Sequence, residues 1–105
     1  MTRAEINPGV CKMIATVEVT AIAKRKVRVD ITSDCEKVAR LSASTQELNL
    51  FEALKPHVDS VLYKHASESR LCASCPVPMA ILKTIEIENG LALPRPVSIN
   101  FTTTE

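Results

Sequence analysis

The sequence contains few aromatic residues and few glycines. Phe, Tyr and Trp together make up 3% of its 105 residues, and Trp is absent. The interior must therefore be filled by aliphatic side chains, and the bases of a nucleic acid would find few rings on which to stack. The two glycines, Gly9 and Gly90, are too few to build a glycine-rich phosphate loop.

Neither sign of charge is in excess. Thirteen Lys and Arg residues stand against twelve Asp and Glu residues, which gives a formal net charge of +1. A protein that binds nucleic acid normally carries a basic excess that neutralises phosphates. We therefore expect no nucleic acid among the partners, while the sequence leaves a protein partner and the oligomeric state open.

Long apolar runs are also missing. Residues 1–9 include Arg3 and Glu5 and are not followed by an apolar segment, which argues against a secretory signal and against a membrane span. We therefore expect a cytoplasmic protein that has no membrane partner. A chain of 105 residues with 46% hydrophobic composition is long enough to bury one core, so we expect residues 1–105 to form a single domain.

Alternating apolar and polar residues predict three strands. The pattern runs through residues 11–21 and again through residues 27–31, with Lys24 and Arg25 between the two runs. These two runs are typical of an antiparallel hairpin. Residues 97–101 show the same alternation and predict a C-terminal strand, with Pro94 and Pro96 at its start, where prolines are tolerated.

Helix signals lie between these strands. Ser33 with Glu36, and Ser44 with the following Glu47, have the spacing of capping boxes, and the second helix should end before Pro56. Residues 58–65 carry apolar side chains at helical spacing, and residues 76–89 form the best-defined predicted helix. We therefore predict an α+β fold in which a small antiparallel sheet, the N-terminal hairpin plus the C-terminal strand, packs against three to four helices.

The predicted core consists of apolar side chains on the inner faces of these strands and of the helix over residues 76–89. Its members are Val17, Val19, Val29, Ile31, Ile81, Ile85, Ile99 and Phe101.

Four cysteines carry the chemistry that the sequence offers. Cys72 and Cys75 form a C-x-x-C motif, whose spacing lets two sulfurs bind one metal ion or close a reversible disulfide. Cys11 and Cys35 supply two further ligands if the fold brings them to the same place. In a reducing compartment such residues are more often thiols, ligands or catalytic groups than permanent disulfides. We therefore expect a zinc ion or an iron–sulfur cluster bound by all four, Cys11, Cys35, Cys72 and Cys75.

Two other interpretations stay open. A thiol redox or sulfur-transfer protein would use Cys75 as the nucleophile and Cys72 as its resolving partner, because the start of a helix favours a thiolate and lowers its pKa. Pro76 and Pro78 remove two N–H groups there, so this depression should be smaller than usual. Alternatively the thiols are buried side chains without a function in a small structural or interaction domain. We expect His57 and His65 to lie at or near the surface, and whether the protein is an enzyme stays open.

Several segments carry a resemblance to a known family. They are Gly9-Val10-Cys11, Ser33-Asp34-Cys35-Glu36-Lys37-Val38, Cys75-Pro76-Val77-Pro78, Ala80-Ile81-Leu82-Lys83 and Gly90-Leu91-Ala92-Leu93-Pro94. Through them nearly the whole chain resembles a family of small uncharacterised proteins, a domain of unknown function, found in anaerobic bacteria and archaea. The resemblance implies that Cys11, Cys35 and Cys75 belong to one site. A second, local similarity links Cys75-Pro76-Val77-Pro78 to the Cys-Pro-x-Pro motif of sulfur-carrier proteins.

Overall fold

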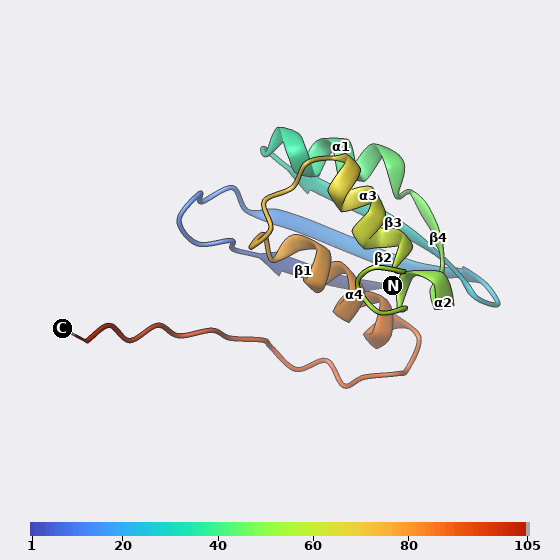
Figure 1. The fold of residues 1–105 in the computed structure, drawn as a ribbon. Helices are drawn as coiled ribbons and strands as arrows, with labels where there is room; N and C mark the ends of the chain where they lie inside the picture. The colour runs from blue at the N-terminus through green and yellow to red at the C-terminus, as the bar shows by residue number, and fades with distance from the viewer. Residues whose placement is uncertain (105) are drawn as a thin grey trace.

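Four antiparallel strands form one sheet in the computed structural model, which describes residues 1–104 (Figure 1). Along the chain the strands are β1 (Thr2–Ile6), β2 (Ala15–Ala23), β3 (Lys26–Ser33) and β4 (Glu47–Asn49). They lie in the sheet in the same order, so every strand pairs with its sequence neighbour. The predicted hairpin of β2 and β3 is therefore confirmed, and β1 extends it on one side. The predicted start of its first strand at residue 11 is wrong, since β2 begins at Ala15 and Cys11 lies in the loop before it.

Four helices follow or interrupt the strands. They are α1 (Glu36–Ser44), α2 (Leu50–Ala53), α3 (Val61–Glu68) and α4 (Val77–Glu88). Side chains cap two of them, since the Asn49 amide oxygen accepts bonds from the N–H groups that open α2 and the Ser60 hydroxyl accepts one at α3. Helix α4 begins after Pro76 and stops at Gly90, whose φ of 73° suits glycine, as its sequence predicts. No helix among residues 1–104 has the length and apolar character needed to cross a membrane.

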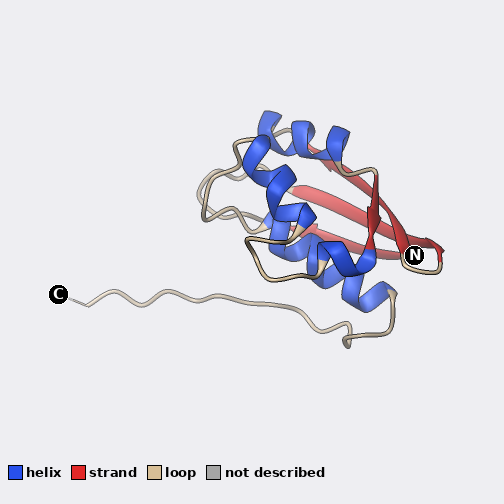
Figure 2. Ribbon diagram, turned by 45° about the vertical axis from the view of Figure 1, so that its right-hand side comes forward, coloured by secondary structure: helices blue, strands red, loops and turns tan. Residues whose placement is uncertain are grey.

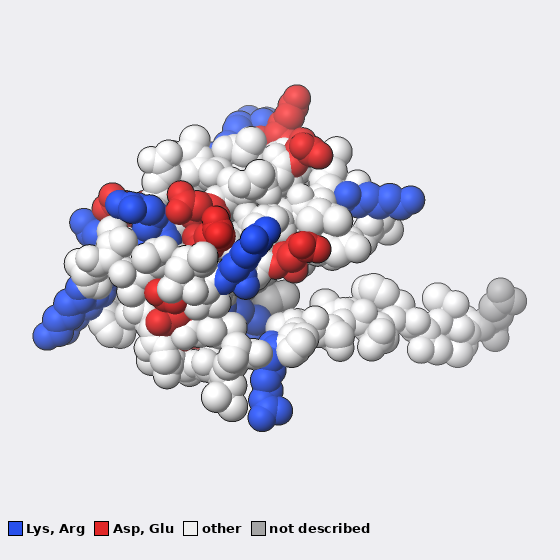
Figure 3. Space-filling view, turned by 180° about the vertical axis from the view of Figure 1, so that it is seen from behind, with Lys and Arg blue, Asp and Glu red and all other residues white. Residues whose placement is uncertain are grey.

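All the helices cover the same face of the sheet (Figure 2). The odd-numbered residues of β2 and β3, such as Val17, Val19 and Val29, are buried beneath them, while the intervening polar residues point away. The other face is open to solvent, and acidic and basic side chains are mixed over the molecule as seen from behind (Figure 3). The structure is thus a two-layer α+β fold, which confirms the predicted class.

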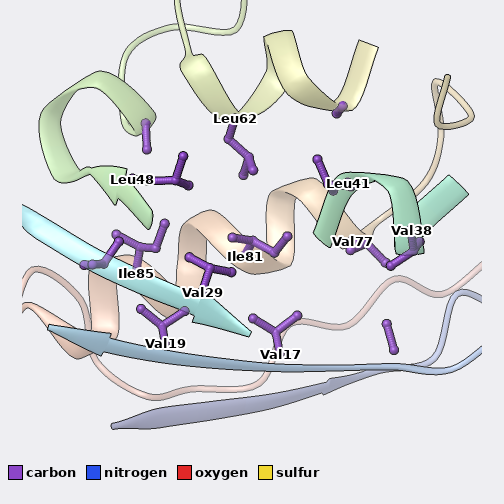
Figure 4. Packing of buried hydrophobic residues seen from close by; sticks show 14 of the residues in the cluster. Val17, Val19, Val29, Val38, Leu41, Leu48, Leu62, Val77, Ile81 and Ile85 are labelled. Carbon is purple, nitrogen blue, oxygen red and sulfur yellow. The ribbon is translucent and has the colours of Figure 1, made fainter. Parts of the chain in front are cut away.

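One hydrophobic cluster lies between the sheet and the helices (Figure 4). Ile81 and Ile85 of α4 pack there with Leu41 of α1 and Leu62 of α3, and all four are fully buried. The core prediction is confirmed for Val17, Val19, Val29, Ile81 and Ile85. Ile31 is only partly buried and packs at the margin of the cluster.

The predicted C-terminal strand is wrong. Residues 91–104 form neither helix nor strand, and the side chains of Ile99 and Phe101 are 66% and 88% exposed. Alternation makes a segment suitable for a strand, but a strand also needs a neighbour with which its backbone can pair. The hairpin is instead joined by β1 and β4, two short strands that the apolar pattern of the sequence did not reveal.

The second predicted helix is also misplaced. Residues 47–49 form β4, which pairs with the start of β3, so that Glu47 lies opposite Arg28. Helix α1 ends at Ser44, where the buried Thr45 hydroxyl donates a 2.8 Å bond to the carbonyl of Leu41. Only the four residues of α2 remain helical before Pro56. The capping-box spacing of Ser44 and Glu47 was therefore misleading, because tertiary pairing with β3 decided the local structure.

Candidate functional site

The pairing register of the sheet brings Cys11 and Cys35 to the same end. Ile6, the last residue of β1, pairs with Ala15, and Ala15 pairs with Ser33 at the end of β3. Cys11 lies in the loop that joins Ile6 to Ala15, and Cys35 follows Ser33 by two residues. Two cysteines that are 24 positions apart in the sequence thus belong to segments at the same end of the sheet, on either side of β2.

Helix α4 brings the C-x-x-C motif to this end as well. Its last residue, Glu88, accepts a 2.8 Å hydrogen bond from the Thr2 hydroxyl and a 3.1 Å bond from the Ala21 N–H. Thr2 and Ala21 lie at the opposite end of the sheet from Ile6, so the start of α4 must lie at the cysteine end. Figure 1 shows the gold segment before α4 close to the blue loop after β1.

Contacts from α1 join the motif to Cys35. The Lys37 ammonium group donates to the sulfur of Cys72 at 3.6 Å, and Arg40 donates to the carbonyl of Ser69 at 3.0 Å. Cys35 itself is the N-cap residue of α1, and its N–H donates to the Ser33 hydroxyl at 3.2 Å. The start of α1 and the loop before α4 are therefore held together by polar contacts.

The cysteines differ in how firmly they are seated. Cys35 and Cys75 are partly buried and pack against the hydrophobic core, whereas Cys11 and Cys72 are exposed. A tight turn links the motif, since the Cys75 N–H donates to the Cys72 carbonyl at 2.9 Å. All four are free thiols. Two sulfurs are thus fixed by packing, and two stand on loops with no core contact that holds their side chains.

The electrostatic setting of Cys75 overturns one prediction. Burial raises the pKa of its thiol, and the N–H of Val77, which donates to the sulfur, offsets only part of that effect. The negative charge of the Cys35, Cys72 and Cys11 thiolates acts in the same direction and raises the pKa of Cys75 further. The lowered pKa expected at a helix start is therefore wrong, because desolvation and like charges outweigh the single remaining donor.

The donor set suits a soft metal by its chemistry. Four thiolates are the usual ligands of structural zinc and of iron–sulfur clusters, and a cation among them would turn their mutual repulsion into attraction. Within residues 1–104, as the side chains stand, no three Cys, His, Asp or Glu residues are arranged to hold a metal ion. The structure thus gathers the four predicted ligands at one end of the molecule without drawing their sulfurs into a coordination shell.

The two histidines lie outside this cluster. The ring of His57 stacks edge-on against Tyr63 at 4.8 Å, and Nδ1 of His65 lies 3.8 Å from the carboxylate of Glu68.

A pocket of about 280 Å³ opens beside the C-x-x-C motif and is lined by Tyr63, Leu71, Cys72 and Cys75 among others. Sequence reasoning missed Lys37 as a neighbour of the site, because the 35 positions between Lys37 and Cys72 conceal their contact.

A comparison with known protein families assigns the chain to one of them. Residues 2–101 match the model of a family of unknown function, DUF6951. The chain belongs to this family. The match includes all four cysteines and confirms the resemblance to a domain of unknown function that the sequence segments carry. No curated protein and no solved structure matches the chain.

Proposed function

We propose that this protein binds a zinc ion or an iron–sulfur cluster through Cys11, Cys35, Cys72 and Cys75 and has no catalytic turnover of its own. The proposal is carried by one observation. Three segments that are far apart in the sequence, the β1–β2 loop, the start of α1 and the loop before α4, meet at one end of the sheet with a cysteine in each.

The difference in burial among the four sulfurs supports the same proposal. Cys35 and Cys75 pack against the core and would provide two preformed ligands, while Cys11 and Cys72 on their loops would complete the set. Zinc in such a site would brace the loops against each other, and a cluster would add a redox centre. A cytoplasmic location fits this proposal, since thiols stay reduced there.

The rival proposal is a thiol redox or sulfur-transfer protein that uses Cys75 with Cys72. Its support is the pocket of about 280 Å³ beside both residues, which would admit a small substrate. The tight turn from Cys72 to Cys75 also suits a reversible disulfide. Metal content and thiol reactivity separate this rival from the metal-binding proposal.

The decisive experiment is metal analysis and absorption spectroscopy of the full chain purified without oxygen. We expect stoichiometric zinc, or iron and sulfide with the visible absorption of a cluster, and Cys75→Ser and Cys11→Ser should each lose most of it. Ser74→Ala is the matched control, because it changes the residue next to Cys75 without removing a sulfur and should keep the metal. Circular dichroism should show that all three variants remain folded.

Two results would contradict the metal proposal. One is a wild-type protein that contains no metal and takes up neither zinc nor a reconstituted cluster. The other is full metal content in both cysteine variants. If the metal-free wild type is alkylated at Cys75 faster than a free cysteine, the redox or sulfur-transfer function is favoured instead. Slow alkylation together with no metal would leave the thiols as packing residues.

A further inference from the structure

The outer edge of β1 has no strand beside it. The sheet begins with β1, which pairs with β2 on one side only, so half of its backbone groups face away from the sheet. A groove of about 730 Å³ runs along this edge, between β1, helix α4 and the C-terminal segment. Free edges of this kind accept a further strand.

The C-terminal segment, residues 91–104, has features that complement this free edge. Its large apolar side chains are exposed, and three of them, Val97, Ile99 and Phe101, alternate with polar residues. Within the described chain, no backbone group of residues 96–104 has a backbone hydrogen-bond partner. The segment leaves the end of α4 and runs out beyond the folded body (Figure 1). A stretch of strand-forming sequence thus has exposed apolar side chains and no backbone pairing.

We infer that residues 97–101 of one copy of this protein add as a fifth strand to the free edge of β1 in a second copy, and that the exchange is reciprocal. A twofold dimer of this kind pairs every free edge with a free segment. In such a dimer residues 97–101 also form a strand, which is the structure that their alternating sequence favours.

The direction of the segment favours a second copy over the chain's own edge. The segment starts next to Glu88, which is bonded to Thr2 at the beginning of β1, and it lines the groove towards Asn7–Gly9 beyond the end of β1. It therefore runs in the same direction as β1 and would pair with its own chain in a parallel manner. A twofold axis perpendicular to β1 would reverse the direction of the segment from the second copy, so that it pairs antiparallel, as all other strands of this sheet do.

The faces of the added strand match the groove. Thr2, Ala4 and Ile6 of β1 are the less exposed residues of that strand, and α4 contributes apolar groups such as Met79 and Ile87 to the same groove. An added strand with Val97, Ile99 and Phe101 on the helix side would continue this apolar face. Its other side would place Ser98, Asn100 and Thr102 in solvent, and the prolines at positions 94 and 96 would lie before the first paired residue.

The test compares two neighbouring substitutions that add the same charge to opposite faces of the segment. In reducing buffer, sedimentation equilibrium of the full chain should show a dimer. Ile99→Asp should raise the dimer dissociation constant by at least about tenfold, because it places a charge against the apolar wall of the groove. Asn100→Asp should leave that constant within about twofold, because the residue faces solvent. Both variants should keep the wild-type circular dichroism, since the segment lies outside the core.

A photo-crosslinking experiment distinguishes exchange between copies from docking within one chain. The wild-type Phe101 is replaced by benzoylphenylalanine, and chains labelled with ¹⁴N and ¹⁵N are unfolded together, refolded and irradiated. Crosslinks from position 101 to β1 or α4 should join differently labelled chains. Crosslinks within one label only would overturn the proposal in favour of docking within the chain. A monomeric wild type, or a dimer that Ile99→Asp leaves intact, would also overturn it. Metal content does not enter any of these readouts.

Discussion

The two ends of α4 are held in opposite ways. At its C-terminal end the side chain of Glu88 is only 12% exposed, and its carboxylate accepts hydrogen bonds from the Thr2 hydroxyl and the Ala21 N–H and pairs with the terminal ammonium group at 3.2 Å. At its N-terminal end no side chain caps the helix. Four thiols gather there, and the Lys37 contact at 3.6 Å is the one side-chain hydrogen bond to a sulfur within residues 1–104.

The two ends therefore differ in their contacts: Glu88 is bonded to the sheet, whereas the thiols at the other end have few partners within the protein. Both oxygens of Glu88 accept hydrogen bonds from partners on β1 and β2, so the residue joins helix to sheet. The sulfurs of the cysteine end have few partners inside the protein. The proposed metal or cluster would supply the partners that these sulfurs lack within the fold.

The largest effect on stability is expected from a truncation in the hydrophobic core, against which both ends of α4 are held. Ile81→Ala should lower the free energy of unfolding by about 2–5 kcal/mol, because the side chain is fully buried between the sheet and the other helices. Val58→Ala, at an exposed position, is the control and should change it by less than about 0.5 kcal/mol. Urea unfolding followed by circular dichroism measures both. Equal stability of the two variants would mean that α4 is not packed as described.

A smaller effect is expected at the Glu88 end. Glu88→Gln should lower the free energy of unfolding by about 1 kcal/mol. The amide keeps one acceptor oxygen, but its NH2 group would face hydrogen-bond donors and could not replace the second oxygen. The cost should also depend on pH. The Ala21 N–H and then the Thr2 hydroxyl lower the pKa of the Glu88 carboxyl below its usual range.

The sign of this pH dependence follows from the lowered pKa. The advantage of wild type over Glu88→Gln should be complete above the pKa of an unfolded glutamate, about 4.3, and should shrink as the pH falls through the lower pKa of the folded protein. Urea unfolding of both proteins at neutral pH and in acid measures it. A difference that grows in acid would show that the Glu88 carboxylate does not stabilise this end.

The smallest effect is expected at the cysteine end. Lys37→Met in the metal-free protein should change the free energy of unfolding by less than about 0.5 kcal/mol, because the ammonium–sulfur contact is exposed to solvent. The contrast with Glu88→Gln sharpens the comparison between the two ends. A loss from Lys37→Met as large as that from Glu88→Gln would show that the cysteine end is braced by its polar contacts even without a ligand.

Local patterns in the sequence predicted some elements well and others poorly. The hairpin of β2 and β3 and the long helix α4 have strong periodicity and clear end signals, and both are found close to where they were expected. The capping-box signal at Ser44 failed because residues 47–49 pair with β3. The alternation of residues 97–101 is genuine, but within one chain these residues pair with no strand.

For the candidate site, the sequence by itself determined which residues could act and the local structure around Cys35, Cys72 and Cys75, because a helix start and a short motif depend on neighbouring residues alone. Cys11 was expected in a strand and lies in a loop instead. Only the tertiary structure decided that the three segments share one end. That outcome depends on the pairing of Ile6 with Ala15 and of Ala15 with Ser33, and on α4 running back along the sheet from the cysteine end towards Thr2. The raised pKa of Cys75 depends on the same assembly, because burial, its main cause, arises only when distant parts of the chain pack together.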